Sequence, residues 1–342
     1  MIICKKCVMT SEVKEITFDK DGVCNFCRTW EKLEQERLKE KQNLPQILNE
    51  LKKGFIIGLS GGMDSSYLLH ILTKEGLKPK MAFSFAGKWD NPLAVENVKK
   101  LVEALKIPFT KVSVDADRYE ELQKAYLKAG VSNIEVPTDH ILMALTYQMA
   151  EKYKVKYIVG GGNHANEDIM PESWSFSAMD LVNMKDIYKT ITGKKLKGLP
   201  VCGVVKWNYY RWWKKIKIIN ILDYVEYKQD EARKVLSEKY DWQDYPNKHE
   251  ENYYTQWFQN CYLPVKFNID KRRAHYSSLI NSKQMTRDEA IRKLTEPVNF
   301  KMIYKPEDFM GITKVSHYDF KIDKWFNRIS KIIKLCKKMN WD

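Results

Sequence analysis

The chain has 342 residues, 44% of them hydrophobic, which is enough to bury the core of two domains or of one large domain with an appendage. That composition excludes disorder along the whole chain, and no apolar run approaches the roughly 18 residues of a membrane span. Lys and Arg outnumber Asp and Glu by 58 to 44, and the formal charge of +14 favours an anionic partner, with nucleic acid, nucleotide sugar, ATP and acidic lipid all open.

Two Cys-x-x-Cys pairs open the chain, Cys4 with Cys7 and Cys24 with Cys27, and sixteen residues separate them. No secretory signal is recognised, so we expect a cytoplasmic protein whose cysteines stay reduced. The spacing is typical of zinc ribbons and predicts that residues 1–30 form a module around one structural Zn²⁺ in a closed tetrahedral shell. A segment this short depends on the metal for its stability. Free buried thiols and a redox-active pair are alternatives that the paired spacing disfavours.

A loop rich in serine and glycine follows the first predicted strand. A charged helix over residues 30–41 and the break at Pro45 lie in a linker over residues 31–52, and the apolar strand 55–59 then runs into Ser60-Gly61-Gly62-Met63-Asp64-Ser65-Ser66. Apolar side chains at helical spacing come next, so the loop joins a strand to the N-terminus of a helix. Unpaired backbone N–H groups and the helix dipole would make an anion site there. A glycine turn without a ligand is the alternative.

Strands and helices alternate after this loop. The predicted elements are strands over 81–85, 110–114 and 157–159 and helices over 93–105 and 138–153. The alternation predicts an α/β domain with a parallel sheet and right-handed crossovers over residues 53–245. Ligands of such open sheets bind beyond the carboxyl ends of the strands, where residues 160–168 would meet the serine-glycine loop.

The loop sequence resembles the PP-loop of N-type ATP pyrophosphatases, a group that includes GMP synthetase, NAD synthetase, asparagine synthetase and several tRNA-modifying enzymes. This resemblance implies that the loop holds the pyrophosphate of ATP and that Asp64 is catalytic and binds Mg²⁺. Gly162-Asn163-x-Ala165-x-Glu167-Asp168 resembles the group's second conserved loop, in which an asparagine and acidic residues face ATP and its metal. The implied ATP-binding residues are Ser60, Gly61, Gly62, Asp64, Ser65, Ser66, Gly162 and Asn163. The implied magnesium ligands are Asp64, Glu167 and Asp168, and a solvated turn with a helix-capping acid is the alternative for the last two.

Further stretches resemble the N-acetyl sugar amidotransferases that build acetamidino sugars for bacterial surface polysaccharides, such as lipopolysaccharide O-antigen, and for flagellin glycans. These stretches are residues 4–9 with 22–27, residues 90–97 and residues 262–280, and the matches extend to about residue 290. The family implies that ATP adenylylates the carbonyl oxygen of an N-acetyl group on a free or nucleotide-linked sugar and releases pyrophosphate. Ammonia from a separate glutaminase, acting with a synthase-like companion, then displaces AMP and leaves an acetamidino group.

The C-terminal region, residues 246–342, is predicted to be mainly helical and to serve the substrate or a partner. The family match implies that Lys271, Arg272 and Arg273 clamp phosphates of ATP or a nucleotide sugar, and a solvated helix face is the alternative. His249 lies in a family-like segment and is a candidate proton shuttle for the ammonia step. The sequence departs from the family there, since glycines are usual at the positions of Pro246 and Asn247, and Glu250-Glu251-Asn252 follow the histidine.

Two stretches and three isolated cysteines leave their roles open. Residues 207–215 mix aromatic and basic side chains, which suits a sugar, nucleic acid, a lipid surface or packing between domains. Residues 321–341 predict a helix with an apolar face opposite many lysines, which docks on its own domain or contacts a partner or a membrane surface. We expect Cys202, Cys261 and Cys336 to be structural.

Two other functions compete with sugar amidation. A tRNA-thiolating or otherwise tRNA-modifying PP-loop enzyme would suit the basic charge and the zinc ribbon, but no cysteine lies between Cys27 and Cys202 to carry sulfur. A zinc-ribbon protein that binds nucleic acid through an inactive ATP fold would not need Asp64 and the loop serines. The sequence therefore does not favour a nucleic-acid partner.

Overall fold

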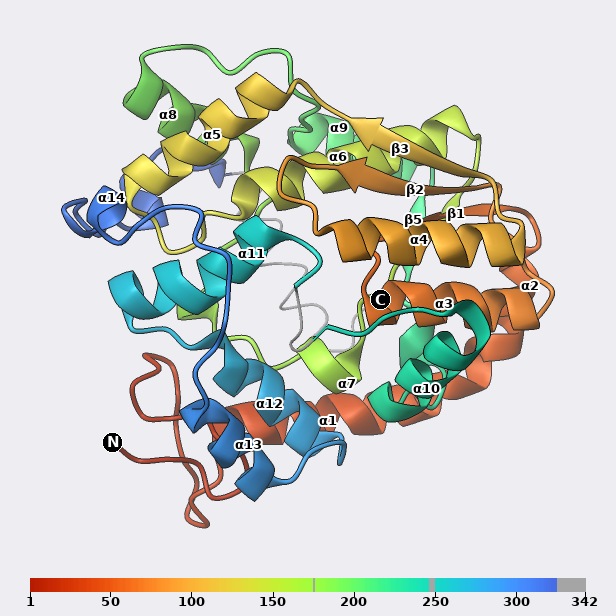
Figure 1. Cartoon of the computed structure of the whole chain (residues 1–342), viewed down its shortest axis with the longest axis horizontal. Helices are drawn as coiled ribbons and strands as arrows, with labels where there is room; N and C mark the ends of the chain where they lie inside the picture. The colour runs from red at the N-terminus through yellow and green to blue at the C-terminus, as the bar shows by residue number, and fades with distance from the viewer. Residues whose placement is uncertain (175, 246–249, 325–342) are drawn as a thin grey trace.

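A parallel sheet of five strands organises the protein (Figure 1), in a computed structural model that describes residues 1–174, 176–245 and 250–324. The strands are β1 (Phe55–Gly58), β2 (Met81–Ala86), β3 (Phe109–Ser113), β4 (Tyr157–Val159) and β5 (Lys217–Ile219). Their order is β3-β2-β1-β4-β5, and every neighbouring pair is parallel. The strand order reverses between β1 and β4, which is where open parallel sheets bind ligands. The predicted α/β class is confirmed.

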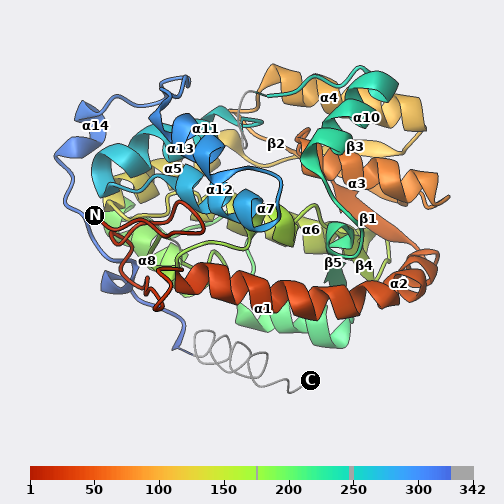
Figure 2. The ribbon, with the colours of Figure 1, turned by 90° about the horizontal axis from the view of Figure 1, so that it is seen from below.

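Helices cover both faces of the sheet. They are α1 (Asn25–Glu40), α2 (Leu44–Leu51), α3 (Met63–Lys74), α4 (Pro92–Leu105), α5 (Ala116–Ala129), α6 (Val136–Lys152), α7 (His164–Glu167), α8 (Leu181–Thr192), α9 (Val204–Asn208), α10 (Gln229–Tyr240), α11 (Tyr253–Trp257), α12 (Lys271–Asn281), α13 (Arg287–Thr295) and α14 (Glu307–Met310). Alternate strand residues point to opposite faces, so Phe55 and Ile57 pack with α3, α4 and α10, whereas Ile56 packs with α6 and α9. The long α1 runs along the underside of the molecule towards α2 (Figure 2).

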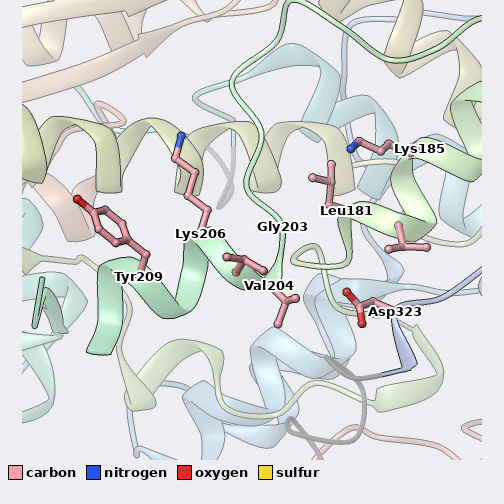
Figure 3. A pocket seen from close by; sticks show the side chains of 9 residues that line it. Leu181, Lys185, Gly203, Val204, Lys206, Tyr209 and Asp323 are labelled. Atoms are coloured by element: carbon pink, nitrogen blue, oxygen red, sulfur yellow. The ribbon is translucent and has the colours of Figure 1, made fainter. Parts of the chain in front are cut away.

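The aromatic and basic stretch 207–215 divides between core and surface. Trp207 and Tyr210 are buried on the α6 side of the sheet, whereas Trp212 and Trp213 are 76% and 80% exposed. Between α8 and α9 lies a mostly apolar hollow of about 550 Å³ (Figure 3), walled by side chains such as Leu181. None of the predicted site residues lines this hollow, so it is separate from the strand ends.

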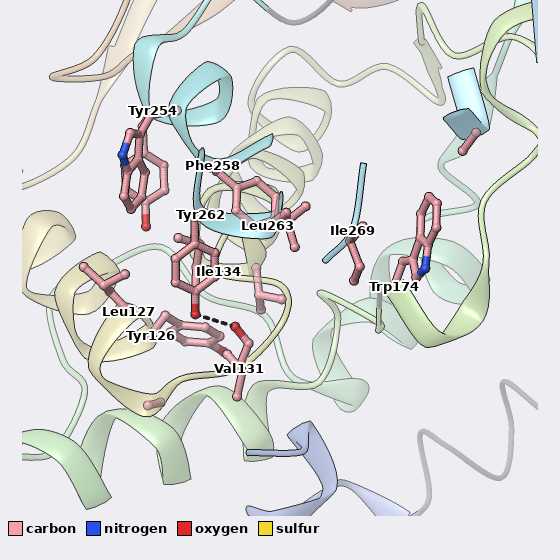
Figure 4. Packing of buried hydrophobic residues seen from close by; sticks show 14 of the residues in the cluster. Tyr126, Leu127, Val131, Ile134, Trp174, Tyr254, Phe258, Tyr262, Leu263 and Ile269 are labelled. Atoms are coloured by element: carbon pink, nitrogen blue, oxygen red, sulfur yellow. Dashed lines mark hydrogen bonds between the residues drawn. The ribbon is translucent and has the colours of Figure 1, made fainter. Parts of the chain in front are cut away.

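The N-terminal cysteine module and the mainly helical C-terminal region share one core. Tyr254 and Tyr262 pack there with aromatic and aliphatic neighbours (Figure 4), and the four cysteines and Trp30 belong to the same cluster. The Tyr262 hydroxyl donates a hydrogen bond of 2.9 Å to the carbonyl oxygen of Val131. Helix α12 also packs against both α1 and α7. The C-terminal region therefore links the cysteine module to the edge of the sheet where the loops gather.

Among the described residues, no helix is both long and apolar enough to cross a bilayer. The predicted tail helix lies almost wholly outside the described residues, since these end at Lys324. Cys336 and His249 also fall outside them.

Candidate active site at the carboxyl ends of the strands

The PP-loop joins β1 to α3 and presents donors without partners. Gly62 is the N-cap of α3 and has no side chain to bond the N–H groups of the first turn. The Gly62 N–H donates to Ser60 Oγ at 3.2 Å, and Ser60 Oγ lies 3.2 Å from Ser65 Oγ. Ser66 Oγ is buried and has no hydrogen-bond partner among the described residues. Backbone and hydroxyl donors thus converge at the positive end of a helix, an arrangement that suits an anion.

Gly61 holds the PP-loop in a conformation that other residues would not tolerate. Its φ of +84° lies in the left-handed region, and a Cβ added there would lie 2.3 Å from the backbone oxygen of Ala94. The Gly61 carbonyl oxygen accepts hydrogen bonds of 3.2 Å from Trp242 Nε1 and from the Tyr245 hydroxyl. The turn is therefore fixed from two sides. The two aromatic anchors were not predicted from the sequence, because they lie some 180 residues further along the chain.

Asp64, in the first turn of α3, is held by two residues that sequence reasoning missed. Its Oδ1 accepts a short hydrogen bond from the Tyr227 hydroxyl and a longer one, 3.5 Å, from Asn166 Nδ2. Burial, followed by the charge of Asp64, raises the pKa of Tyr227 far above its usual range, so this phenol remains a donor. The charge of Glu167 acts on Tyr227 in the same direction, which places this exposed carboxylate near the Asp64 pair.

The loop after β4 lies against the PP-loop. A Cβ added at Gly161 would lie 3.2 Å from the backbone nitrogen of Ser65, a tight contact that shows how closely the two loops pack. Gly162 follows, next to the Asn220 side chain. Asn163 is buried and its Oδ1 accepts the N–H of Asn166 at 3.0 Å, which caps α7. The structure thus brings the two predicted loops together and gives Asn163 a local role in shaping the second one.

Asp168 is engaged away from the PP-loop. Its Oδ2 pairs with Arg37 Nη2 of α1 at 3.1 Å and with the ring of His164. Arg37 Nη1 pairs at 2.5 Å with Asp223 Oδ1, and that same oxygen accepts the His164 N–H at 2.7 Å. The predicted magnesium set stays a prediction, and in this structure Asp168 is engaged by Arg37 and His164. The Asp168 carboxylate belongs to an ion-paired joint between α1 and α7, whereas Asp64 and Glu167 lie near Tyr227.

The three residues of the predicted phosphate clamp lie in different surroundings, and the clamp stays a prediction. Arg272 is fully occupied, because it forks onto Asp270 at 2.8–3.2 Å and donates to the last carbonyl groups of α13. Arg273 Nη1 donates to the carbonyl oxygen of Val8 at 3.1 Å and so holds the cysteine module. Lys271 faces a different neighbourhood, with its Nζ 5.4 Å from the centre of the Phe258 ring. Of the three cations, Arg272 alone forms an ion pair within the described residues, and Lys271 has neither an ion pair nor a hydrogen bond to a described carbonyl oxygen.

The four N-terminal cysteines form a compact group of potential metal ligands. Their sulfur atoms lie within 4.8 Å of one another, and within the described residues this is the one such group of three or more potential ligands. Cys7 Sγ and Cys24 Sγ are 3.7 Å apart, close to the roughly 3.8 Å between sulfurs that each lie ~2.3 Å from a tetrahedral Zn²⁺. Cys4 Sγ accepts backbone N–H groups at 3.2–3.4 Å, as thiolate ligands do. The donor set fits a single tetrahedral ion with no open position.

Comparison with known families matches two stretches of the chain. A model described as NAD synthase matches residues 39–202, and one described as LPS biosynthesis protein WbpG-like, C-terminal domain, matches residues 251–335. The chain belongs to the PP-loop superfamily and carries a WbpG-like C-terminal domain. The first match contains the PP-loop and Asp64, and the second begins at Glu251 and includes α12.

Individual relatives of this chain are distant. The tRNA-specific 2-thiouridylase MnmA 2 of Fusobacterium nucleatum is 26% identical over 115 residues, 32% of this chain and 33% of that protein. The chain thus matches about a third of the length of this curated relative. The solved structure of NMN synthetase from Francisella tularensis covers 54% of this chain and 98% of its own, with 18% identity and a TM-score of 0.31.

A second solved structure, the U34-tRNA thiolase NcsA from Methanococcus maripaludis with its [4Fe-4S] cluster, covers 90% of this chain and 93% of its own. Its sequence identity is 14% and its TM-score is 0.34. Both TM-scores are too low to carry an argument about function.

Proposed function

We propose that this protein is an ATP-dependent, AMP-forming amidotransferase that converts the N-acetyl group of a bacterial surface-glycan sugar, free or nucleotide-linked, to an acetamidino group. The observation that carries the proposal is the pairing of a PP-loop with a WbpG-like C-terminal domain in one chain. The proposed domain division is residues 1–30, 31–52, 53–245 and 246–342, and the proposed location is the cytoplasm.

In the proposed reaction the carbonyl oxygen of the N-acetyl group attacks the α-phosphorus of ATP. The bond to the bridging oxygen breaks and pyrophosphate leaves. Ammonia then adds to the amide carbon, the carbon–oxygen bond breaks, and AMP departs with the original carbonyl oxygen. An N-acetyl group is a poor electrophile, so adenylylation supplies the leaving group that ammonia needs.

The PP-loop supports the first step. The N–H groups at the start of α3 and the unpartnered Ser66 hydroxyl would hold the departing pyrophosphate. Asp64, oriented by Tyr227, would hold Mg²⁺ with Glu167 close by. Bound Mg²⁺ would offset the charge on the pyrophosphate. A four-cysteine zinc ion would be purely structural.

A separate protein is proposed to supply the ammonia. Cys202 and Cys261 are both buried, and burial raises the pKa of each thiol, which disfavours the thiolate that a glutaminase or a sulfur carrier needs. The Cys202 N–H donates to His140 Nε2 at 3.0 Å, and the thiol lies in the core beside α6. A glutaminase and a synthase-like companion would therefore act with this chain.

The test is to incubate the purified protein with ATP, Mg²⁺, ammonium chloride and a panel of N-acetylated sugars and nucleotide sugars, with mass spectrometry of the products. The expected product has one oxygen replaced by NH, in step with AMP and pyrophosphate. With an ¹⁸O-labelled acetyl group, the label should appear in AMP. AMP without label would overturn the adenylylation step.

The rival function is tRNA modification, which the partial match to a tRNA-specific 2-thiouridylase favours. The same assay separates the two functions. If AMP forms only after tRNA is added, and no sugar in the panel changes mass, then the tRNA-modifying function replaces the proposed one.

A further inference from the structure

Two carboxyl groups that the proposed adenylylation does not use lie at the N-terminal end of α6. Glu135 is 8% exposed, and Asp139 lies one helical turn later on the same side of the helix. Helix α6 leads into β4, so its N-terminal end lies at the carboxyl edge of the sheet, with the PP-loop. Glu135 Oε2 accepts a hydrogen bond of 2.8 Å from Thr255 Oγ1, and Thr138 Oγ1 donates to Glu135 Oε1 at 3.4 Å. These bonds fix the position of the buried carboxyl.

Lys271 faces this pair from α12. The charges of Asp139 and Glu135 both act on its ammonium group, which nevertheless forms no ion pair within 4 Å of a carboxylate in the described parts of the chain. The Lys271 ammonium group is therefore near both carboxyl groups but forms no direct ion pair with either of them.

Tyr254 gives a second, independent sign of a missing ligand. Its side chain is 1% exposed, and its hydroxyl has no hydrogen-bond partner in the described structure. After burial, the charge of Glu135 has the largest effect on the pKa of this hydroxyl, and it raises that pKa. Buried hydroxyl groups without a partner are rare, and they indicate an absent water or ligand.

One short segment ties this cluster to the PP-loop. The Glu251 side chain lies against Gly62, where an added Cβ would be 1.9 Å from Glu251 Oε1. Thr255, which bonds Glu135, is only four residues further on, and four residues span at most about 14 Å. The backbone of Thr255 therefore lies within about 14 Å of Glu251, and the cluster lies at the same edge of the sheet as the PP-loop.

We propose that Glu135, Asp139, Lys271 and the Tyr254 hydroxyl form the ammonia site of the enzyme, with the two carboxyl groups accepting protons from the attacking nitrogen. This inference rests on the proposed function. An ammonium ion that becomes the NH₂ group of an amidinium gives up two protons, one before it attacks the carbon and one before AMP leaves. Two carboxylates in one site can receive both, and solvent then removes them through the exposed Asp139.

The acidities support this role. Burial, and then the charge of Asp139, raise the pKa of Glu135 to about 7, and desolvation raises the pKa of Asp139 to about 6 although its side chain reaches solvent. Burial lowers the pKa of Lys271. The ionisable groups around Glu135 are Asp139, Lys271, Tyr119 and Tyr254. Carboxyl groups in this range exchange protons readily near neutral pH.

The first test measures binding without any sugar. A ligand of the folded state raises the melting temperature, so the wild type should melt at a higher temperature in ammonium chloride than in sodium chloride of equal ionic strength. Glu135→Gln and Asp139→Asn should lose this difference, and Glu103→Gln, on the exposed face of α4, should keep it. Equal stabilisation of the wild type by potassium chloride, or an unchanged ammonium effect in both variants, would overturn the proposal.

The second test separates the two half-reactions with the sugar that the panel identifies. Asp139→Asn should retain sugar-dependent exchange of pyrophosphate into ATP, while formation of the acetamidino product falls by about 100-fold, a typical contribution of general base catalysis. Hydroxylamine is largely unprotonated at neutral pH. When it replaces ammonium, the difference in the rate of product formation between Asp139→Asn and the wild type should become smaller. If Asp139→Asn loses both the exchange of pyrophosphate into ATP and the formation of the acetamidino product, these residues serve adenylylation or folding and the proposal fails. If no sugar reacts, the proposed function fails, while the melting test still decides whether the cluster binds ammonium.

Discussion

The Tyr227 hydroxyl donates a hydrogen bond to the carboxylate of Asp64, a residue 163 positions earlier in the chain. Asn166 donates to the same oxygen from the loop after β4. The acidic residue of the PP-loop is thus oriented by one side chain from each of two distant segments. Its geometry depends on tertiary structure as much as on the motif that contains it.

Removing this support should slow ATP chemistry without unfolding the protein. We expect Tyr227→Phe to lower the rate of AMP formation by about 10-fold, equal to about 1.4 kcal/mol of transition-state stabilisation, because Asp64 loses its main donor. Asp64→Asn should abolish pyrophosphate release. Tyr240→Phe removes a hydroxyl bonded to His70 outside the loop and is the matched control. Equal turnover in Tyr227→Phe and the wild type would contradict the assignment.

Replacing single glycines by alanine should distinguish a glycine required by a close backbone contact from one that only adopts a positive φ. Gly61→Ala should lose ATP turnover and much of the free energy of unfolding, since its Cβ would meet the fixed backbone of Ala94. Gly76 has a similar φ of +73° with nothing within 4 Å of an added Cβ, so Gly76→Ala should cost only about 1 kcal/mol in urea unfolding and keep full turnover. Equal stability losses in the two variants would contradict the role of the close contact.

The cysteine group should bind one zinc ion per chain. Elemental analysis of the purified protein should give this ratio, and Cys24→Ser should lose both the metal and thermal stability. Asp64→Ala should retain the zinc, because the two sites are separate. Iron with the absorption of a cluster in place of zinc would contradict the tetrahedral assignment drawn from the sulfur spacing.

Asp168→Asn should act on stability more than on chemistry. Its carboxylate pairs with Arg37 and His164, so the variant weakens the joint between α1 and α7. We expect a lower melting temperature, with AMP formation at 25 °C changed by less than about threefold. If Asp168→Asn abolished AMP formation as completely as Asp64→Asn, that result would support Asp168 as a magnesium ligand.

The burial of His317 should make the free energy of unfolding depend on pH. Burial lowers the pKa of this imidazole from 6.5 to about 3, and its ring stacks on Phe176. The unfolded chain therefore binds the proton more readily, and stability is lost as pH falls below 6.5. Between pH 7 and pH 5 the wild type should lose about 2 kcal/mol more than His317→Gln in urea unfolding. Parallel losses in the two proteins would contradict the buried neutral histidine.

The elements that could be predicted from the sequence are those defined by local pattern. The strands at β1, β2, β3 and β4 follow from short apolar runs next to helices of regular period, and the cysteine group follows from spacing alone. Strand β5 was missed because it has three residues, two of them exposed, and directly follows an aromatic and basic turn. Its short length gives no alternating pattern to detect.

The parts of the site that could not be predicted are those set by long-range contacts. Trp242, Tyr245 and Tyr227 carry no motif, and only packing brings them to the PP-loop. Arg272 and Arg273 show the converse, because a run of basic residues in sequence resembles a phosphate clamp, yet each guanidinium is engaged by a protein oxygen elsewhere. The charge of a residue is visible in the sequence, but the direction of its side chain is not.

The contacts around the cysteine group set an order for biosynthesis. Arg287 donates to the carbonyl oxygens of Cys4 and Cys7, and Asn281 Nδ2 lies 3.2 Å from Cys27 Sγ. When only the first quarter of the chain has been synthesised, all four cysteines are therefore present, but the residues that enclose them are not. We expect the nascent segment to exchange its metal freely until α12 and α13 emerge, and to retain it only once translation is nearly finished.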